Sequence, residues 1–100
     1  MRKGVLEYCI LSIIADSEVY ASDIITQLKD AELIVVEGTL YPLLTRLKND
    51  NLLSYRWEES KSGPPRKYYT ITENGKAFLL ELDKGWNELV ISVNKIREKN

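Results

Sequence analysis

The chain has 100 residues, of which 44% are apolar and 29% are charged, and its net charge is −1. Such a chain forms one ordinary globular domain and is short for an enzyme that builds its own cleft. It has one cysteine and no histidine, which excludes an internal disulfide, the common zinc sites and histidine-assisted nucleophilic catalysis within one chain. We therefore expect no cofactor, no enzymatic activity and a cytoplasmic location, with Cys9 as a buried structural thiol.

The first third of the chain predicts two helices and a short strand. Residues 3–16 form a helix whose apolar stripe is wider than a small domain needs, so part of it is expected to face a partner. Glu7 interrupts the apolar run, which argues against a signal peptide, and no run is long enough to span a membrane. Residues 20–31 form a second helix. The β-branched residues at 33–36 predict a brief edge strand that pairs with a later hairpin.

Residues 37–51 contain an amphipathic helix. Leucines at i, i+3, i+4 and i+7 define its inner face, namely Leu40, Leu43, Leu44 and Leu47. The helix begins between Glu37 and Thr39, because Pro42 is tolerated only in or near the first turn. It ends at residues 49–51, where Asn51 can adopt the left-handed conformation of a helix stop. The outer and flanking faces carry hydrogen-bonding side chains: Thr39, Tyr41, Thr45, Arg46, Lys48 and Asn49.

A β-hairpin follows this helix. Its strands are residues 53–58 and 66–71, and the turn contains Lys61, Gly63, Pro64 and Pro65. Residues 37–70 carry six basic and four acidic side chains, a net charge of +2, whereas residues 1–36 carry three basic and six acidic side chains, a net charge of −3. Positive charge is therefore concentrated in the amphipathic helix and the hairpin.

The last predicted element is a long helix that Thr72 caps and that runs from Glu73 almost to the C-terminus. Its apolar residues are spaced by three and four along its whole length, as in a heptad seam: Leu79, Leu82, Trp86, Leu89, Val93 and Ile96. This seam either folds back across the first helix or crosses into a second subunit. We favour a homodimer, because strict three-four spacing is a signature of helix pairing.

The order of these elements predicts a winged helix-turn-helix, in which the amphipathic helix enters a DNA major groove and the basic hairpin is the wing. The expected fold class is mainly α with a small β-hairpin wing, plus a long C-terminal dimerisation helix. Residues 1–72 are expected to form the DNA-binding domain and residues 73–100 the dimerisation helix, packed as one compact domain.

Three motifs in order resemble the PadR-like family of transcriptional regulators, and the resemblance covers nearly the whole chain. The family's opening helix is similar to Gly4-Val5-Leu6-Glu7 and Ile10-Leu11. Its recognition-helix motif is similar to Glu37-Gly38-Thr39-Leu40-Tyr41-Pro42-Leu43-Leu44 with Arg46-Leu47. Its wing and the entry to its last helix are similar to Gly63-Pro64-Pro65-Arg66-Lys67-Tyr68-Tyr69, Ile71-Thr72 and Gly75.

The length of the chain resembles the short branch of that family, which has a single C-terminal helix. Two departures from the family pattern are Tyr20-Ala21-Ser22, where Tyr-Gly-Tyr is common, and Asn51, where glycine is common. The resemblance implies a dimeric DNA-binding repressor, often relieved by a small, aromatic or cationic effector.

The expected DNA contacts come from the amphipathic helix and the wing: Thr39, Tyr41, Thr45, Arg46, Lys48, Asn49, Lys61, Arg66 and Lys67. Neighbouring side chains of a strand alternate, so at most one of Arg66 and Lys67 points at DNA together with Lys61. Trp57 is interpreted as part of the wing's packing core. A dimer would read a palindromic double-stranded operator. The alternative is a winged-helix module that binds protein, which the low net charge favours.

Trp86 lies in the middle of the heptad seam, next to Gly85. In a dimer, its indole either fills the core or flanks a gap that accepts a planar aromatic or cationic effector. The family resemblance favours the gap, since short relatives bind planar effectors near an aromatic residue of this helix. The remaining walls would come from the first helix, through Val5, Leu6, Cys9 and Ile13.

Overall fold

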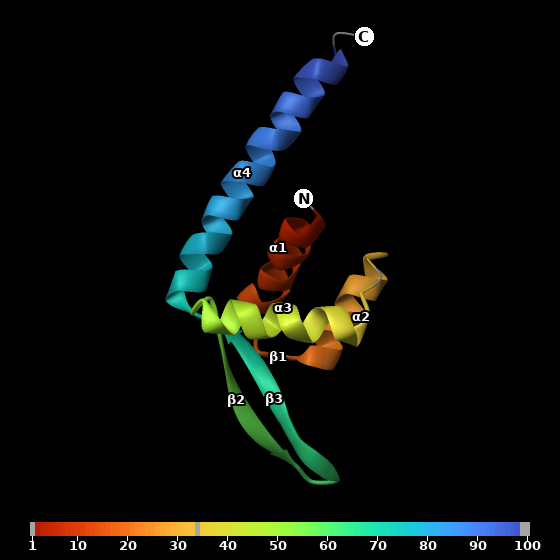
Figure 1. Cartoon of the computed structure of the whole chain (residues 1–100), viewed down its shortest axis with the longest axis vertical. Coiled ribbons are helices and arrows are strands. Elements are labelled where there is room, and N and C mark those ends of the chain that lie inside the picture. The colour runs from red at the N-terminus through yellow and green to blue at the C-terminus, as the bar shows by residue number, and fades with distance from the viewer. Residues whose placement is uncertain (1, 34, 99–100) are drawn as a thin grey trace.

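The computed structural model describes residues 2–33 and 35–98. The elements in chain order are α1 (Arg2–Ala15), β1 (Val19–Tyr20), α2 (Ala21–Asp30), α3 (Glu37–Asn49), β2 (Leu53–Ser60), β3 (Gly63–Ile71) and α4 (Glu73–Glu98). Helices α1, α2 and α3 lie together, the β2–β3 hairpin projects from one end of them, and α4 rises in the other direction (Figure 1). This arrangement confirms the predicted winged helix-turn-helix, mainly α with a small antiparallel sheet.

The hydrophobic core lies where the three N-terminal helices meet the base of the hairpin. The four inward leucines predicted for α3 are all buried, and each such side chain contributes about 1.5–3 kcal/mol of transfer free energy. They pack with apolar side chains of the other elements: Ile10, Leu11, Ile14, Val19, Ile24, Leu28, Leu53 and Tyr69. The core therefore fixes the orientation of α3 and leaves its opposite face in solvent.

The third strand of the sheet lies elsewhere than predicted. Strand β1 pairs antiparallel with β3, with Val19 opposite Tyr69, and the strand order is β1-β3-β2. The expected edge strand at 33–36 is wrong for residues 33, 35 and 36, which form a connection to α3, while Ile34 lies outside the described residues. The left-handed conformation of Glu32 (φ 65°) turns the chain there, and the Leu33 amide bonds back to the Leu28 carbonyl.

The end of α3 and the start of α4, on either side of the hairpin, have the helix stop and the helix cap predicted from the sequence. Asn51 has φ 63° after the end of α3, which confirms the left-handed helix stop. The Thr72 hydroxyl accepts a hydrogen bond from the Gly75 amide at 2.9 Å and donates to the Asn51 carbonyl at 2.6 Å, which confirms Thr72 as the cap of α4. The same cap therefore joins the end of α3 to the start of α4.

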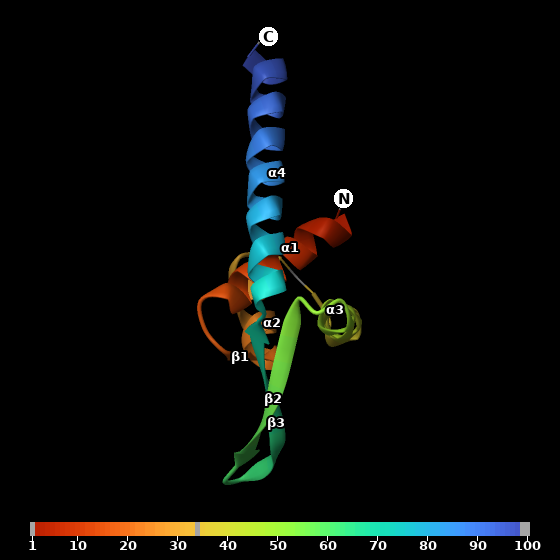
Figure 2. The ribbon, with the colours of Figure 1, turned by 90° about the vertical axis from the view of Figure 1, so that its left-hand side faces the viewer.

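Helix α4 has a packed half and a projecting half. Leu79 and Leu82 are half-buried and pack against the core, next to α1. Beyond them the helix extends past the end of α1 into solvent (Figures 1 and 2). Within the described residues, no helix combines the length and hydropathy that crossing a bilayer requires.

Candidate nucleic-acid interface

The exposed face of α3 presents a polar stripe toward the wing. Tyr41, Thr45 and Lys48 recur at i, i+4 and i+7, so they lie on one side of the helix, and all three are exposed. Tyr41 borders a hollow that also touches the wing, and Thr45, Lys48 and Asn49 border a second one. The stripe is the part of α3 that a molecule held between helix and wing would contact.

The wing presents a basic and aromatic face toward that stripe. The pairs Tyr55–Tyr69 and Trp57–Lys67 lie opposite each other in the hairpin, so the four side chains share one face. The Lys67 ammonium lies 4.4 Å from the centroid of the Tyr55 ring and 5.2 Å from that of Trp57. The Lys48 ammonium of α3 lies 5.7 Å from the same Tyr55 ring. Two lysines from separate elements thus converge across the space between them.

Trp57 is not part of the wing's packing core, which corrects the expectation from the sequence. It is 60% exposed. Alternation correctly puts it on the face of Tyr55 and Tyr69, but α3 covers only the base of the hairpin, where Leu53 and Tyr69 are buried. Farther out along the hairpin, α3 no longer covers this face, so the side chain of Trp57 is exposed to solvent.

The space between α3 and the wing is a groove, which we call the α3–wing groove. Its larger part measures about 480 Å³ and its smaller part about 120 Å³, and Lys67 and Tyr69 border both. The start of α2 closes one side through Ala21 and Ser22, two of the residues where the chain departs from the family pattern. Leu44 and Pro65 add apolar surface, and the remaining wall residues are polar, aromatic or basic: Tyr20, Tyr41, Thr45, Lys48, Asn49, Tyr55, Trp57, Arg66 and Lys67.

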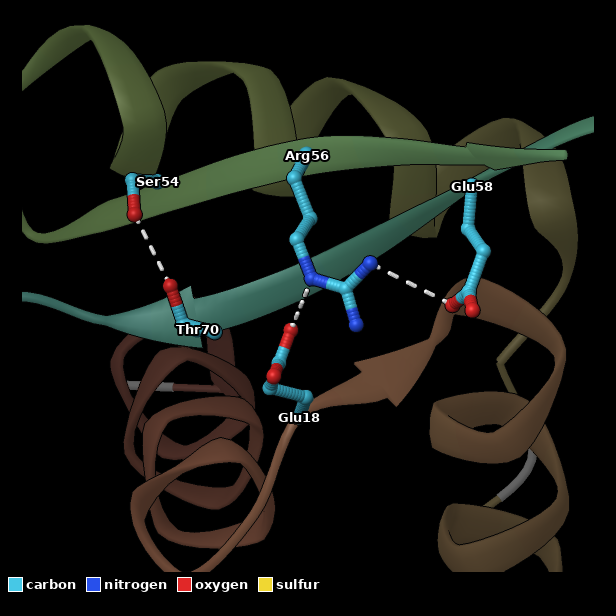
Figure 3. Close-up of polar contacts among 5 residues, drawn as sticks. All are labelled: Glu18, Ser54, Arg56, Glu58 and Thr70. Carbon is cyan, nitrogen blue, oxygen red and sulfur yellow. Dashed lines mark hydrogen bonds and ion pairs between the residues drawn. The ribbon is translucent and has the colours of Figure 1, made fainter.

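The opposite face of the wing holds an ion-pair network that ties the hairpin to the body (Figure 3). The Arg56 Nε donates to Glu18 at 2.7 Å, and a second guanidinium nitrogen lies 3.3 Å from Glu58. The hydrogen bond to Glu18 raises the pKa of Arg56. The hydroxyls of Ser54 and Thr70 bond across the strands at 2.8 Å. Arg56 is therefore occupied in holding the wing, on the side away from the α3–wing groove.

Stacked tyrosines extend this attachment. The Tyr20 and Tyr68 rings stack with centroids 3.9 Å apart, and the guanidinium groups of Arg56 and Arg66 lie 4.7 and 5.3 Å from the Tyr68 and Tyr20 centroids respectively. The contact with the Tyr20 hydroxyl raises the pKa of Tyr68 to about 12. Arg66 and Lys67 both line the larger part of the α3–wing groove, although strand alternation puts them on opposite faces of the wing.

The other predicted DNA contacts are distributed unevenly. Lys61 is exposed at the tip of the wing, and Thr39 is exposed in the first turn of α3, outside the walls of the groove. Arg46 forms an ion pair with Glu7 of α1, and the two side chains are 38% and 18% exposed. This pair places Arg46 on the flank of α3 that faces α1. The role of Arg46 in DNA contact stays a prediction. Nothing in the sequence indicates that Glu7 is its ion-pair partner.

A second groove lies between α1 and α4 and measures about 310 Å³. Of the residues predicted to bind an effector, Val5 and Trp86 line it, together with Gly4, Tyr8, Glu81, Leu82, Gly85 and Leu89. Leu6, Cys9 and Ile13 instead pack against the core, and burial raises the pKa of the Cys9 thiol. Tyr8, which sequence reasoning missed, lies with its ring centroid 6.2 Å from that of Trp86 and donates to Asp83 at 2.5 Å. This hydrogen bond raises the pKa of Tyr8.

The predicted heptad seam divides into two parts. Leu79 and Leu82 are covered by their own chain, whereas the remaining members are largely in solvent: Trp86, Leu89, Val93 and Ile96. Leu89 is 41% exposed and Ile96 is 68% exposed. Among the described residues, the projecting half of α4 thus carries an apolar stripe that its own subunit does not cover.

Comparisons with known proteins agree with this geometry. The model of the transcriptional regulator PadR-like family matches residues 10–81. A PadR-like transcription factor from Bacteroides fragilis is 64% identical with a TM-score of 0.88, and the match covers 96% of this chain and 93% of that one. A PadR family transcriptional regulator from Eggerthella lenta is 34% identical with a TM-score of 0.88, over 99% and 87% of the two chains. The chain belongs to the PadR-like family of transcriptional regulators.

Membership defines the class of the protein as a transcriptional regulator and confirms that it is not an enzyme. A more distant structure is PadR from Bacillus subtilis in complex with operator DNA, with 26% identity and a TM-score of 0.72. That match covers 78% of this chain and 46% of the Bacillus chain. The shared part is therefore less than half of the longer protein.

Proposed function

We propose that the protein is a cytoplasmic, sequence-specific DNA-binding regulator that holds double-stranded DNA against the α3–wing groove. The observation that carries this proposal is the groove itself, where the exposed stripe of α3 faces a basic wing across a space with lysines on both sides. The complex of the Bacillus relative with operator DNA supports it. The net charge of −1 favours a protein-binding module instead, but that sum includes acidic residues far from the groove.

In this proposal α3 contacts bases and nearby phosphates, and the wing contacts phosphates. Tyr41, Thr45, Lys48 and Asn49 lie on the exposed side of α3 and would meet base edges and nearby phosphates in the major groove. Lys61, Arg66 and Lys67 would meet phosphates from the wing. Thr39 would contact a phosphate at the start of α3. Arg46 would have to leave Glu7 to reach DNA, so we assign it mainly to holding α3 on α1.

Substitutions in α3 and in the wing should affect binding differently. Tyr41→Ala should weaken binding to a duplex enriched from a random-sequence library by about 1–3 kcal/mol, because it removes a contact in the major groove. Its affinity for a scrambled duplex should change much less. Lys61→Ala should weaken both duplexes equally and reduce the slope of log K against log salt by about 0.9, because it removes one phosphate contact.

Gel-shift titrations at two salt concentrations measure these effects. The matched control is Lys76→Ala, because Lys76 is exposed on α4 and forms its ion pair within that helix. If the wild-type protein bound no duplex at low salt, or if Tyr41→Ala and Lys61→Ala reduced both affinities identically, the assignment of base reading to α3 would be wrong.

The regulator is proposed to be a homodimer that pairs through α4 and reads a palindromic operator. The projecting half of α4, residues 83–98, is more than four turns of helix whose apolar stripe stays in water unless a partner covers it. A second copy fits, because the three-four spacing of the seam is self-complementary and brings like stripes together about a two-fold axis. Residues 1–72 would then bind DNA, and residues 73–100 would join the subunits.

The groove between α1 and α4 is proposed as the site at which a planar aromatic or cationic effector relieves repression. Tyr8 and Trp86 supply aromatic surface, and Glu81 supplies a negative charge at the edge. The groove opens beside the seam, so an effector there would contact both subunits. It would regulate DNA binding only if its affinity differed between the DNA-bound and free arrangements of the dimer.

Tryptophan fluorescence tests this site. Titration with riboflavin or proflavine should quench the emission of Trp86 in a Trp57→Phe protein, because a planar ring stacked on the indole lies in direct contact with it. The quenching should be absent in Trp86→Ala, which retains Trp57. Quenching that survived in Trp86→Ala and disappeared in Trp57→Phe would place the ligand on the wing and remove the effector from this groove.

A further inference from the structure

The most exposed aromatic side chain of the α3–wing groove is Trp57. An indole that could be buried gains roughly 25 cal/mol for each Å² of apolar surface removed from water, yet this one is 60% exposed. It is also held in place. Tyr55 meets it edge-on, with centroids 6.2 Å apart and ring planes at 89°, and Lys67 lies over its face. The ring therefore contacts neighbouring side chains on the wing and is still exposed to a ligand.

The surroundings of Trp57 indicate the chemistry of that ligand. Pro64 and Pro65 lie beside the indole and form an apolar hollow with it near the outer part of the wing. Lys67 is on its inner side, and Lys48 of α3 faces the same wing surface. The acidic side chain that borders the hollow is Glu59. An apolar ring next to converging cations matches a chain of alternating sugars and phosphates.

We propose that Trp57 and Lys67 form a backbone-binding element for duplex DNA, in which the indole packs against a deoxyribose and Lys67 contacts the adjacent phosphate. The proposal rests on the DNA-binding function above and adds a residue to it. In a duplex the bases are stacked inside, so a ring on the wing meets the sugar edge, whereas a single strand would offer a base face. Sugars carry no sequence information, so the contact sets affinity and the wing's angle and does not select bases.

Trp57→Thr should reduce DNA affinity without unfolding the protein. Threonine keeps the strand propensity of the site, and the exposed position leaves the core intact. Loss of the aromatic contact should weaken the enriched and the scrambled duplex by the same factor, roughly five- to tenfold. Trp57→Phe, which keeps an aromatic ring, should recover most of the loss. Lys76→Ala, on an exposed part of α4 whose ion pair stays within that helix, should bind like the wild type.

The test uses the full-length Trp86→Phe protein, in which Trp57 is the sole tryptophan. Binding of a fluorescein-labelled duplex is followed by anisotropy, and the access of acrylamide to Trp57 is measured in parallel with the unlabelled duplex. We expect saturation of the anisotropy to coincide with a blue shift of Trp57 emission and at least a halving of acrylamide quenching, since the indole leaves water.

Two outcomes separate this inference from the proposed function. Full anisotropy saturation with Trp57 as accessible as in the free protein, and with Trp57→Thr binding like wild type, would overturn the contact while leaving DNA binding intact. No anisotropy change with either duplex at low salt, for the wild-type protein as well as for Trp86→Phe, would overturn the proposed function and the contact together. A stronger effect of Trp57→Thr on a single strand than on the duplex would also contradict the proposal.

Discussion

Leu89→Asp is expected to convert the dimer into monomers or aggregates. Leu89 lies on the projecting half of α4, 41% exposed within its own subunit, and in the proposed dimer it faces the same helix of the partner. An aspartate there would place two carboxylates in an apolar seam. Burying an unpaired charge costs about 3–5 kcal/mol, which is a loss of roughly two to four orders of magnitude in association.

Sedimentation velocity over a range of protein concentrations measures this effect. The control is Asn87→Asp, which introduces the same charge on the same helix but points away from the seam, because residue 87 lies about 160° around the helix from residue 89. Asn87→Asp should remain dimeric. A folded Leu89→Asp protein that sedimented as the wild-type dimer would move the interface away from α4.

Gly75→Ala should be the most destabilising of the glycine-to-alanine changes. Gly75 is buried in the first turn of α4, and a Cβ there would lie 2.1 Å from the Leu52 carbonyl oxygen and 2.7 Å from Ile71 Cγ1. The oxygen belongs to the backbone and accepts a hydrogen bond from the Thr72 amide, so it cannot rotate away. Overpacking against a fixed backbone costs about 3 kcal/mol or more.

Thermal unfolding followed by circular dichroism tests this expectation. A cost of 3 kcal/mol lowers the Tm of a domain of this size by more than about 12 °C. Gly38→Ala is the matched control, since no atom lies within 4 Å of a Cβ at that exposed position of α3. Gly38→Ala should keep or slightly raise the Tm. An unchanged Tm in Gly75→Ala would mean that the α3–α4 junction can shift freely.

The fold was predictable where a local sequence signal allows only one structure. The leucine stripe of α3, the left-handed Asn51 and the Thr72 cap are local signals with a single physical solution, and all three are found in the structure. The prediction of a strand at 33–36 was wrong, because β-branched residues indicate that a segment favours the extended conformation but not that a neighbouring strand is there to pair with it. Val19 and Tyr20 form the strand instead, since they lie beside β3 in the folded chain.

The candidate site was predictable only in part, because its long-range partners leave no trace in the sequence. The polar outer face of α3 follows from helical period, and its exposure is confirmed for Tyr41, Thr45 and Lys48. Glu7 lies far from Arg46 in the chain, and Tyr8 lies 75 residues from Asp83. Neither pair could be found without the packing of α1. Trp57 was misassigned because alternation gives the face of a strand but not how far α3 extends along it.

Hydroxyl-radical footprinting on the enriched duplex shows whether a dimer reads DNA through α3 and the wing. We expect two protected backbone segments related by two-fold symmetry, with centres about one helical turn, or 10 base pairs, apart. The protection should weaken with rising salt as phosphate contacts are lost. No protection at saturating protein and low salt, or one continuous unsymmetrical footprint, would contradict a dimer that reads DNA through α3 and the wing.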